Sequence, residues 1–526
     1  MSSDSDRLKN AVFYNKDLMM LVASLLIGTD DIGLNLYRSP SLPLLLTFRA
    51  LYNEFRTGNE IKSVVNDFMT SVSMIEWAMY MGCNFIPHSD KLCNYAAARG
   101  DITILHWARN HQSVPFAWSP ETVAAAAGAG RLDVVQWLRG QSPPCPWSSS
   151  TCSRAASCGS LSVIQWARSQ TPPCPWDKYT CCNAAAGGHL AILQWIRAAQ
   201  PPCPWGDYTC GNAAKGGHLD IIQWARSQIP PCPWSGMTCR NAAGGGHLHV
   251  LEWARSQDPP CNWNSEACYK AAKGGHFHIL KWLRSRNPPC PWDERTCSSA
   301  AEGGHLHILQ WVRAQQPPCP WDWRTCSVAA TKGHLDILRW ARAQNPPCPW
   351  DHWTCSNAAK SGHLDVIIWA RSQQPPCPYN NMTCFHAAEG GQLHVLQWLR
   401  EQDPPCPWDI YSCANAAREG HLDVLKWLRS QDPPCPWDEV TCDKASTAGR
   451  LDVLKWVRSQ DPPCPWDEAA CSGACFAGHL ELLQWLRLQH PPCPWDFVEC
   501  YNHVVATNNW TILDWLQTQD EYVSMA

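Results

Sequence analysis

A repeat constrains the fold of this chain more than any other feature: a Cys-Pro-Trp-like segment recurs every 29 residues along most of the 526-residue chain. A second cysteine follows the first by seven residues in every copy, and a second tryptophan series runs at the same spacing. Self-similarity at a period of about 20 to 50 residues is typical of repeat proteins, whose units stack on their neighbours. The first cysteines of the thirteen copies are Cys145, Cys174, Cys203, Cys232, Cys261, Cys290, Cys319, Cys348, Cys377, Cys406, Cys435, Cys464 and Cys493.

One copy, residues 203–231, reads CPWGDYTCGNAAKGGHLDIIQWARSQIPP and predicts two short helices. The first spans about residues 208–215 and ends at Gly216-Gly217, and the second spans about residues 218–228 and ends at two prolines. In eight copies Asp follows the Cys-Pro-Trp tripeptide, where it can cap the first helix. Because helices this short are marginal alone, we expect them to be stabilised by stacking on neighbouring units.

The repeats extend beyond the Cys-Pro-Trp copies at both ends. Trp107 and Trp77 before the second tryptophan series, and Trp515 after it, bring the count to about sixteen units over residues 60–519. The terminal units lose the pattern, for example at Phe116 and Val123, where the cysteines are replaced. Atypical end units are expected of capping repeats. The sequence therefore predicts an all-α helical solenoid, with residues 1–59 before it and a tail at 520–526 after it.

Charge and hydropathy exclude several classes of protein. The formal net charge is -4, which argues against a generally basic nucleic-acid binder. The longest apolar run, residues 18–28, is far shorter than the roughly 20 residues of a membrane span. The first nine residues lack the basic start of a secretory signal. We therefore expect a cytoplasmic protein in a reducing compartment and no membrane partner.

The string Thr209-Cys210-x-x-Ala213-Ala214-x-x-Gly217-His218-Leu219 resembles the ankyrin repeat, and it recurs along most of the chain. The period is 29 where that family has 33, and Cys stands where the family has proline. These departures favour a tight proline-rich turn over the long β-hairpin of that family. The whole resembles a short, Trp- and Cys-rich variant such as large DNA viruses and single-celled algae carry. The resemblance implies a scaffold that binds protein partners without catalysis and without a cofactor.

The cysteine pairs allow three interpretations. They could be disulfides, metal ligands, or small apolar side chains in the core. Zinc sites favour cysteines about two to four residues apart and four ligands. Here the two cysteines are seven residues apart and each unit lacks a fourth ligand, which argues against zinc. The cysteines are replaced only by apolar residues, which favours core packing, so we predict no metal site. Disulfide- or metal-stabilised rods remain the alternatives.

Two further series recur at fixed positions. The histidine of Gly-His-Leu could titrate near neutral pH, but a residue at the turn into a helix can also bond backbone groups of its own or the adjacent unit, which we favour. Arginine stands two residues after the helix tryptophan in every unit from Arg109 to Arg487. A line of arginines could bind phosphate, but each lies in the last helical turn, where it can reach terminal carbonyls or stack on a tryptophan, and we favour that structural use. The helix tryptophans are expected to form a stacked core ladder.

Positions that differ between copies indicate where partners could bind, because the shared fold fixes the constant ones. The residues after Trp-Asp and after the second cysteine vary widely. Exposed aromatic and arginine side chains there are plausible anchors for a partner. The predicted partner-binding residues are Tyr179, Tyr208, Arg295, Trp323, Arg324, His352, Trp353 and Tyr411.

Residues 1–59 allow two interpretations. Two apolar stretches, residues 17–26 and 45–56, predict helices. They weakly resemble an F-box, which would recruit a ubiquitin-ligase adaptor, but a helical cap on the first repeat explains the same residues. The main prediction is thus a non-catalytic protein-binding solenoid, with nucleic acid not expected as a partner. The alternatives are an F-box-like substrate-recruiting subunit and a nucleic-acid binder that uses the arginine line.

Overall fold

The computed structural model describes residues 72, 75, 89–110, 118–507 and 509–519. The chain divides into two compact units, Met1–Ala96 with Asp101–Ala117 and Ala97–Gly100 with Trp118–Ala526. Helix α6 (Ser89–Arg99) crosses the division, and α7 (Ile102–Arg109) belongs to the first unit. The described residues form thirty helices and no strand, so the predicted all-α solenoid is confirmed. The predicted F-box or cap at residues 1–59 and the tail at 520–526 lie outside the described residues.

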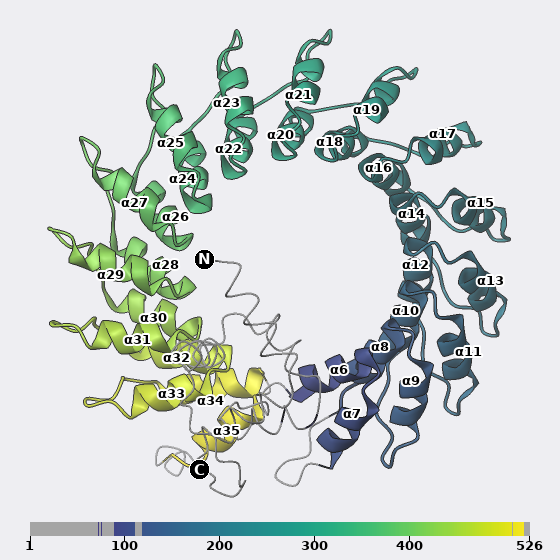
Figure 1. Cartoon of the computed structure of the whole chain (residues 1–526), viewed down its shortest axis with the longest axis horizontal. Coiled ribbons are helices and arrows are strands. Elements are labelled where there is room, and N and C mark those ends of the chain that lie inside the picture. Colours follow the sequence, from purple (N-terminus) through teal and green to yellow (C-terminus); the bar gives the residue numbers. More distant parts are fainter. Residues whose placement is uncertain (1–71, 73–74, 76–88, 111–117, 508, 520–526) are drawn as a thin grey trace, which may run out of the picture. The chain divides into compact units, whose positions relative to one another are not determined.

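Within the second unit, helix pairs follow one another along a curve, with the first helix of each pair on the inner side and the second on the outer side (Figure 1). The inner helices are α8 (Pro120–Gly128), α10 (Ser149–Ser157), α12 (Lys178–Ala186), α14 (Asp207–Gly216), α16 (Gly236–Gly245), α18 (Ser265–Lys273), α20 (Glu294–Glu302), α22 (Trp323–Thr331), α24 (His352–Ser361), α26 (Asn381–Glu389), α28 (Ile410–Glu419), α30 (Glu439–Thr447), α32 (Glu468–Ala477) and α34 (Phe497–Ala506). The outer helices are α9 (Leu132–Arg139), α11 (Leu161–Ser169), α13 (Leu190–Ala198), α15 (Leu219–Ser227), α17 (Leu248–Ser256), α19 (Phe277–Arg284), α21 (Leu306–Arg313), α23 (Leu335–Arg342), α25 (Leu364–Arg371), α27 (Leu393–Arg400), α29 (Leu422–Ser430), α31 (Leu451–Arg458), α33 (Leu480–Arg487) and α35 (Trp510–Leu516).

The inner helices begin and end as the sequence predicts. The carboxylate of Asp351 accepts a hydrogen bond of 3.0 Å from the backbone N–H of Trp353, which caps α24. At the other end, Gly217 has φ +79° and follows α14. A Cβ at Gly217 would lie 2.5 Å from Nδ1 of His247, so this turn needs glycine both for its backbone and for its neighbour. Short helices are thereby fixed at both ends.

Alanine and branched aliphatic residues form the core. Ala213 and Ala214 of α14, and Ile221 and Ile222 of α15, are fully buried, and the equivalent residues are buried in the neighbouring pairs. Small side chains on the inner helices let the backbones of adjacent units approach closely, while the aliphatic side chains of the outer helices fill the space between the layers. Burial of this kind supplies about 25 cal/mol per Å² of apolar surface, so the stability of each pair depends on its neighbours.

A tight loop without β-structure joins each outer helix to the next inner helix, as the proline-rich sequence predicts. Cys232 closes the loop after α15, because its N–H bonds the carbonyl of Ala225 at 2.9 Å. The guanidinium of Arg226 donates to the carbonyl of Cys232 at 2.8 Å and lies 4.4 Å from the ring centroid of Trp234. The same arrangement recurs from Arg139 to Arg487. The repeated arginines therefore stabilise the loops through a backbone carbonyl and a tryptophan ring, which confirms the prediction that they have a structural use.

The tryptophans occupy a different place from the predicted core ladder. Trp205 and Trp224 of one unit meet edge to face with ring centroids 5.9 Å apart, and both are half-buried. The equivalent pairs recur along the unit. The tryptophans thus cover the buried cysteine and alanine core, and the loop tryptophans, such as Trp234, also present their faces to the arginines.

The cysteines pack against one another across unit boundaries. Cys210 of one unit and Cys232 of the next lie in one buried cluster with Ala225. The pKa of the Cys210 thiol is raised, first by its side-chain hydrogen bond with Cys232 and then by burial. All described cysteines are free thiols and all but Cys158 are buried, which confirms the packing interpretation. The second cysteine of each copy from Cys152 to Cys471 contacts the first cysteine of the next copy, 22 residues later, whereas the sequence suggested the neighbour seven residues away.

No helix among residues 89–110, 118–507 and 509–519 is both long and apolar enough to cross a membrane.

Candidate functional site

All eight predicted partner-binding residues lie in the first turn of an inner helix. Tyr179 of α12, Tyr208 of α14 and Tyr411 of α28 occupy the same position of the repeat, and each exposes about half of its surface (57%, 52% and 50%). Trp323 of α22 is also exposed, whereas His352 and Trp353 of α24 are half-buried. The remaining two residues are Arg295 of α20 and Arg324 of α22, and both are exposed. The structure therefore places the set on one surface, the inner face of the array, but spreads it over six helices.

Cations accompany several of these aromatic rings. The ammonium group of Lys178 lies 5.5 Å from the ring centroid of Tyr179, and that of Lys270 lies 5.7 Å from the ring of Tyr269. On α22 the guanidinium of Arg324 lies 5.5 Å from the ring of Trp323. A cation beside an exposed ring provides a charge and a flat apolar face at the same place.

Arg295 links α18 and α20. Its guanidinium donates to the carboxylate of Asp293 at 2.6 Å and to the hydroxyl of Ser265 at 2.9 Å, and lies 5.0 Å from the ring of Tyr269. Burial would raise the pKa of Asp293, but its hydrogen bonds with Arg295 and Ser265 outweigh that effect and lower the pKa. Arg295 is thus held above Tyr269 with its outer edge in solvent.

A second aromatic group lies on α24 and α26. The ring of Trp353 lies 5.2 Å from that of His352 and 5.7 Å from that of His386, and His386 in turn contacts Phe385 at 4.7 Å. The sequence marked His352 and Trp353 as candidates, while Phe385 and His386 belong to the variable pair after the second cysteine. Stacking across adjacent inner helices brings the two variable positions together.

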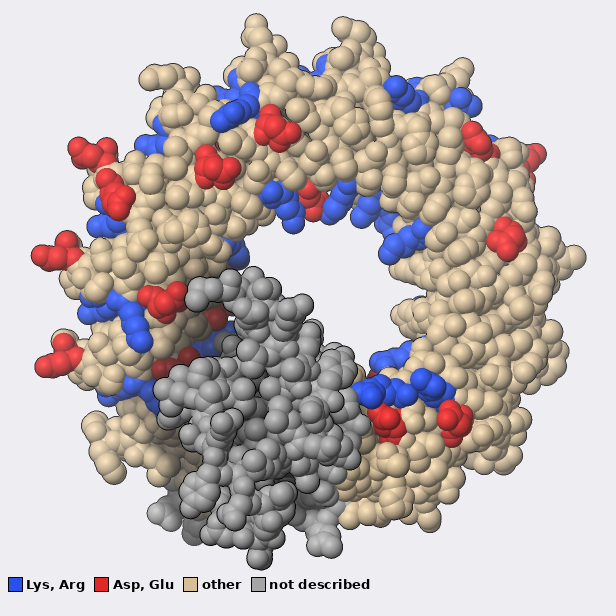
Figure 2. Space-filling model, viewed as in Figure 1, with Lys and Arg blue, Asp and Glu red and all other residues tan. Residues whose placement is uncertain are grey.

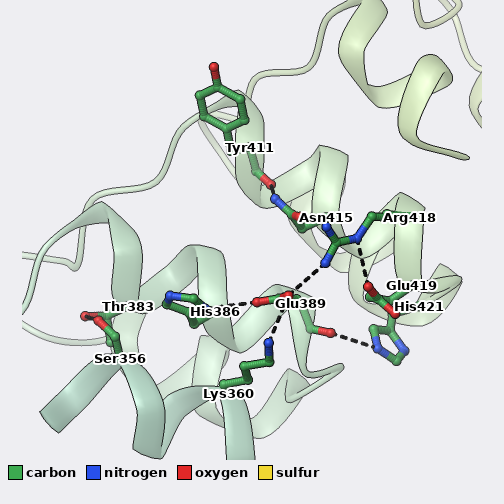
Figure 3. Close-up of polar contacts among 10 residues, drawn as sticks. All are labelled: Ser356, Lys360, Thr383, His386, Glu389, Tyr411, Asn415, Arg418, Glu419 and His421. Atoms are coloured by element: carbon green, nitrogen blue, oxygen red, sulfur yellow. Dashed lines mark hydrogen bonds and ion pairs between the residues drawn. The ribbon is translucent and has the colours of Figure 1, made fainter. Parts of the chain in front are cut away.

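Beside this group, Glu389 connects three units (Figure 3). Its carboxylate accepts hydrogen bonds from Lys360 at 2.9 Å, from Nδ1 of His386 at 2.9 Å and from Arg418 at 2.8 Å. Burial would raise the pKa of Glu389, but its hydrogen bonds with Lys360 and His386 lower it. The sequence did not reveal this network, because Lys360, Glu389 and Arg418 stand at the same repeat position in three successive copies. That alternation of charge at one repeat position was the available signal.

Charge is distributed unevenly along the inner helices. From α12 to α24 they carry eight Lys or Arg against four Asp or Glu, whereas from α26 to α34 they carry two against six. The aspartates that cap these helices add four acidic residues to each section, which gives eight basic against eight acidic side chains in the first section and two against ten in the second. Figure 2 shows Lys and Arg side chains along the inner side of the array. We call α12–α24 the basic section and α26–α34 the acidic section. The cations of the basic section are Lys178, Lys215, Arg240, Lys270, Lys273, Arg295, Arg324 and Lys360.

The Gly-His-Leu histidines contact the backbone, as the sequence favoured. Nε2 of His247 lies 3.0 Å from the carbonyl oxygen of Lys215 in the preceding unit, and Nε2 of His421 lies 3.2 Å from that of Glu389. Where arginine replaces the histidine, Nε of Arg450 donates to the carbonyl of Arg418 at 3.0 Å. The position therefore ties adjacent units together. In the described part of the chain, no three His, Cys, Asp or Glu side chains converge to hold a metal ion.

Comparisons with known proteins give no family. No family model matches the chain, and no curated protein matches it. The solved structures that match include the pentatricopeptide repeat protein PPR10 in complex with an 18-nt psaJ RNA element and a cysteine variant of the same complex. Each has a TM-score of 0.25 and 11% identity, over 93% of this chain and 88% of that chain. Because the TM-score is so low, the function of this chain is inferred below from its own side chains.

These findings correct the ankyrin assignment. No family model supports it, and the two solved structures named above are pentatricopeptide repeat proteins. The Ala-Ala, Gly-His-Leu string carried the resemblance, yet the structure gives each part a local role. The alanines allow close helix packing, the glycine takes a left-handed turn and the histidine bonds the preceding unit. Any closely stacked helix pair needs these residue types, so the string does not identify the family.

The predicted function and partner are corrected as well. The protein-binding scaffold rested on the ankyrin assignment and is withdrawn with it. Nucleic acid was set aside because the whole chain has a net charge of -4. That total is the wrong quantity, because the acidic residues concentrate in one section of the inner helices and the basic ones in another. The arginine line, which the nucleic-acid alternative invoked, is engaged with loop carbonyls and tryptophans.

Proposed function

We propose that the inner face of the basic section, α12–α24, binds single-stranded nucleic acid. The observation that carries the proposal is the repeated pairing of an aromatic ring with a cation on the inner helices α12, α18, α20 and α22. The rings of Tyr179 and Trp323 are exposed, and that of Tyr269 is half-buried. Proteins that bind single strands combine a positively charged track for the phosphates with rings on which bases stack. The pairs are Lys178 with Tyr179, Lys270 and Arg295 with Tyr269, and Arg324 with Trp323.

A single strand fits this surface better than a duplex. The rings can stack only on bases that are themselves unstacked, and a duplex offers its bases only at the grooves. The fixed repeat presents one aromatic or basic side chain after another in register, so little ordering of the protein is needed on binding. No catalysis is part of the proposal.

The test is a titration of a fluorescein-labelled strand of about 20 nucleotides, longer than the ~4–16 nucleotides of typical single-strand sites, with RNA and DNA measured separately. Fluorescence anisotropy is recorded at several salt concentrations. We expect affinity to fall steeply with salt, with a slope of about -0.7 for each phosphate contact. Lys178→Gln and Arg324→Gln should each reduce the slope by about 0.7. Lys444→Gln, which lies in the acidic section, is the control and should leave the slope unchanged.

The stacking component has its own matched pair. Tyr208 and Tyr411 occupy the same repeat position and are equally exposed, but they lie in the basic and acidic sections respectively. Loss of one stacked base costs about 1–3 kcal/mol, so Tyr208→Ala should weaken binding about 5- to 100-fold. Tyr411→Ala should have little effect. Equal losses from both variants, affinity that is independent of salt, or no binding to either strand would refute the proposal.

A further inference from the structure

Six histidines gather on three consecutive outer helices, outside the aromatic and basic surface described above. In α17, α19 and α21 the residue that precedes the helix and the second residue within it are both histidine. The pairs are His247 with His249, His276 with His278, and His305 with His307. Their ring centroids lie 6.0, 6.4 and 6.1 Å apart. We call these six residues the histidine cluster. Elsewhere in the array the second position of the outer helix carries Asp, Ser, Ala, Glu, Thr or a lone His394.

The histidine cluster borders the basic section. Nε2 of His247, His276 and His305 lies 3.0 to 3.2 Å from a carbonyl oxygen at the C-terminal end of the preceding unit's inner helix. Those oxygens belong to Lys215, Gly244 and Lys273. Lys215 and Lys273 are two cations of the basic section, and their side chains are exposed. The cluster therefore lies against the C-terminal ends of inner helices of the basic section, the ends that carry Lys215 and Lys273.

The outer member of each pair is open to solvent. His249, His278 and His307 are exposed, whereas His247, His276 and His305 are half-buried. The three exposed rings stand at successive repeats and in equivalent positions, so they form a row parallel to the row of inner-helix cations. A protonated imidazole can donate from both nitrogens and bind phosphate oxygens.

From these placements we propose that the histidine cluster is a second phosphate-binding site, which contacts the backbone of the bound strand when the imidazoles are protonated. The site extends the surface of the proposed function and rests on it. At neutral pH the strand is held by the Lys, Arg and aromatic side chains of the basic section alone. As pH falls, the outer row adds charge next to Lys215 and Lys273.

The charged groups around the cluster set the size of this effect. Within the outer helices, Glu252 and Lys281 stand one turn beyond His249 and His278. From the flanking units, Asp220 and Asp336 occupy the position equivalent to the outer histidines. On the inner helices, Lys215 and Lys273 supply the carbonyls that His247 and His305 contact, and the ammonium group of Lys273 is paired with the carboxylate of Glu302 at 2.5 Å. Burial lowers the pKa of His247, and its hydrogen bond to the carbonyl of Lys215 opposes that effect, while nearby His249, His218 and His276 lower it further. Bound phosphate would favour the charged form of every member.

The experiment compares strand affinity at about pH 7.5 and about pH 5.5, on either side of the usual histidine titration near ~6.5. The probe is a labelled uridine or thymidine homopolymer, whose bases do not protonate in this range. Three additional phosphate contacts steepen the salt slope by about 2 and raise affinity about 10- to 100-fold near 0.1 M salt. The triple variant His249→Ala, His278→Ala, His307→Ala should lose this gain and bind as the wild type does at the higher pH. Alanine stands at the same position naturally, at Ala191 of α13.

His394→Ala is the matched control. Nε2 of His394 lies 3.2 Å from the carbonyl oxygen of Gly362, just as Nε2 of His249 lies 3.1 Å from that of Gly217, but His394 has no paired histidine and lies on α27 beside the acidic section. It should leave the pH dependence unchanged. If the strand binds at pH 7.5 and gains nothing at pH 5.5, or if the triple variant keeps the gain, the second site is refuted while the proposed function stands. If the strand binds at neither pH, both are refuted.

Discussion

Removing one arginine of the repeated line tests whether it fastens the loops or binds a ligand. The guanidinium of Arg342 donates to the carbonyl of Cys348 at 2.6 Å and lies 4.1 Å from the ring centroid of Trp350. A hydrogen bond contributes about 1 kcal/mol net, and a cation–π contact at a partly exposed site contributes about 0.5–1 kcal/mol. Arg342→Gln should therefore destabilise the boundary between two units by about 2 kcal/mol.

The assay is urea unfolding followed by far-ultraviolet circular dichroism, with hydrogen exchange mass spectrometry to locate the change. Because units in an array interact only with their neighbours, faster exchange should appear near α23 and α24 and leave distant repeats unaffected. Arg342→Lys keeps the charge but loses the planar fork, so it should cost nearly as much. Trp350→Tyr is the mild control, since Arg371 stacks naturally on Tyr379 at 4.0 Å. A variant Arg342→Gln with unchanged stability and weakened strand binding would show that the line is a binding surface.

Three further predictions concern single side chains. The lowered pKa of Glu389 means that its carboxylate stabilises the fold fully above the ordinary carboxyl pKa, and that this contribution is lost as pH falls through the lowered pKa. The urea midpoint of the wild type should therefore drop between about pH 5 and pH 3, and that of Glu389→Gln should drop less. Equal drops would contradict this reasoning. Cys158 is the exposed thiol among the described cysteines, so it should react first with a thiol reagent under native conditions, which peptide mapping would show. Faster modification of the buried cysteines would contradict the interpretation that they pack in the core. Gly217→Ala should destabilise the protein by about 1–3 kcal/mol in thermal melts, because Gly217 has a positive φ and lies close to His247. Gly206→Ala should cost less, because a Cβ at Gly206 meets nothing within 4 Å.

Much of the fold could be predicted from the repeat itself. Local sequence rules predict the turn at Gly217, the helix caps such as Asp351 and the prolines that end the outer helices, and the same residue types recur in most copies. The packing of Cys210 against Cys232 could not be read from the sequence, because that partner is set by how units stack and the nearest cysteine in the sequence is a different one. The half-burial of the tryptophans depends on the same stacking distance.

The sequence marked the variable positions as candidates but did not give the chemistry of the surface. Tyr208 and Arg295 occupy the same repeat position, in the first turns of α14 and α20, and both are exposed, since a shared fold leaves only surface positions free to vary. The interpretation of that surface failed because net charge was taken over the whole chain. Only the helix pairs show that Lys178 and Lys270 share a face with Tyr179 and Tyr269, while Glu439 and Glu468 lie in another section.

The most direct test of the central claim is ultraviolet crosslinking of a bound single strand to the protein, followed by mass spectrometry of the crosslinked peptides. Zero-length crosslinks form at side chains in contact with the bases, and exposed tyrosine and tryptophan are suited to it. We predict crosslinks at inner-helix residues of the basic section, above all Tyr179, Tyr208, Tyr269 and Trp323. Crosslinks confined to the outer helices, to the proline loops or to α26–α34 would contradict the account.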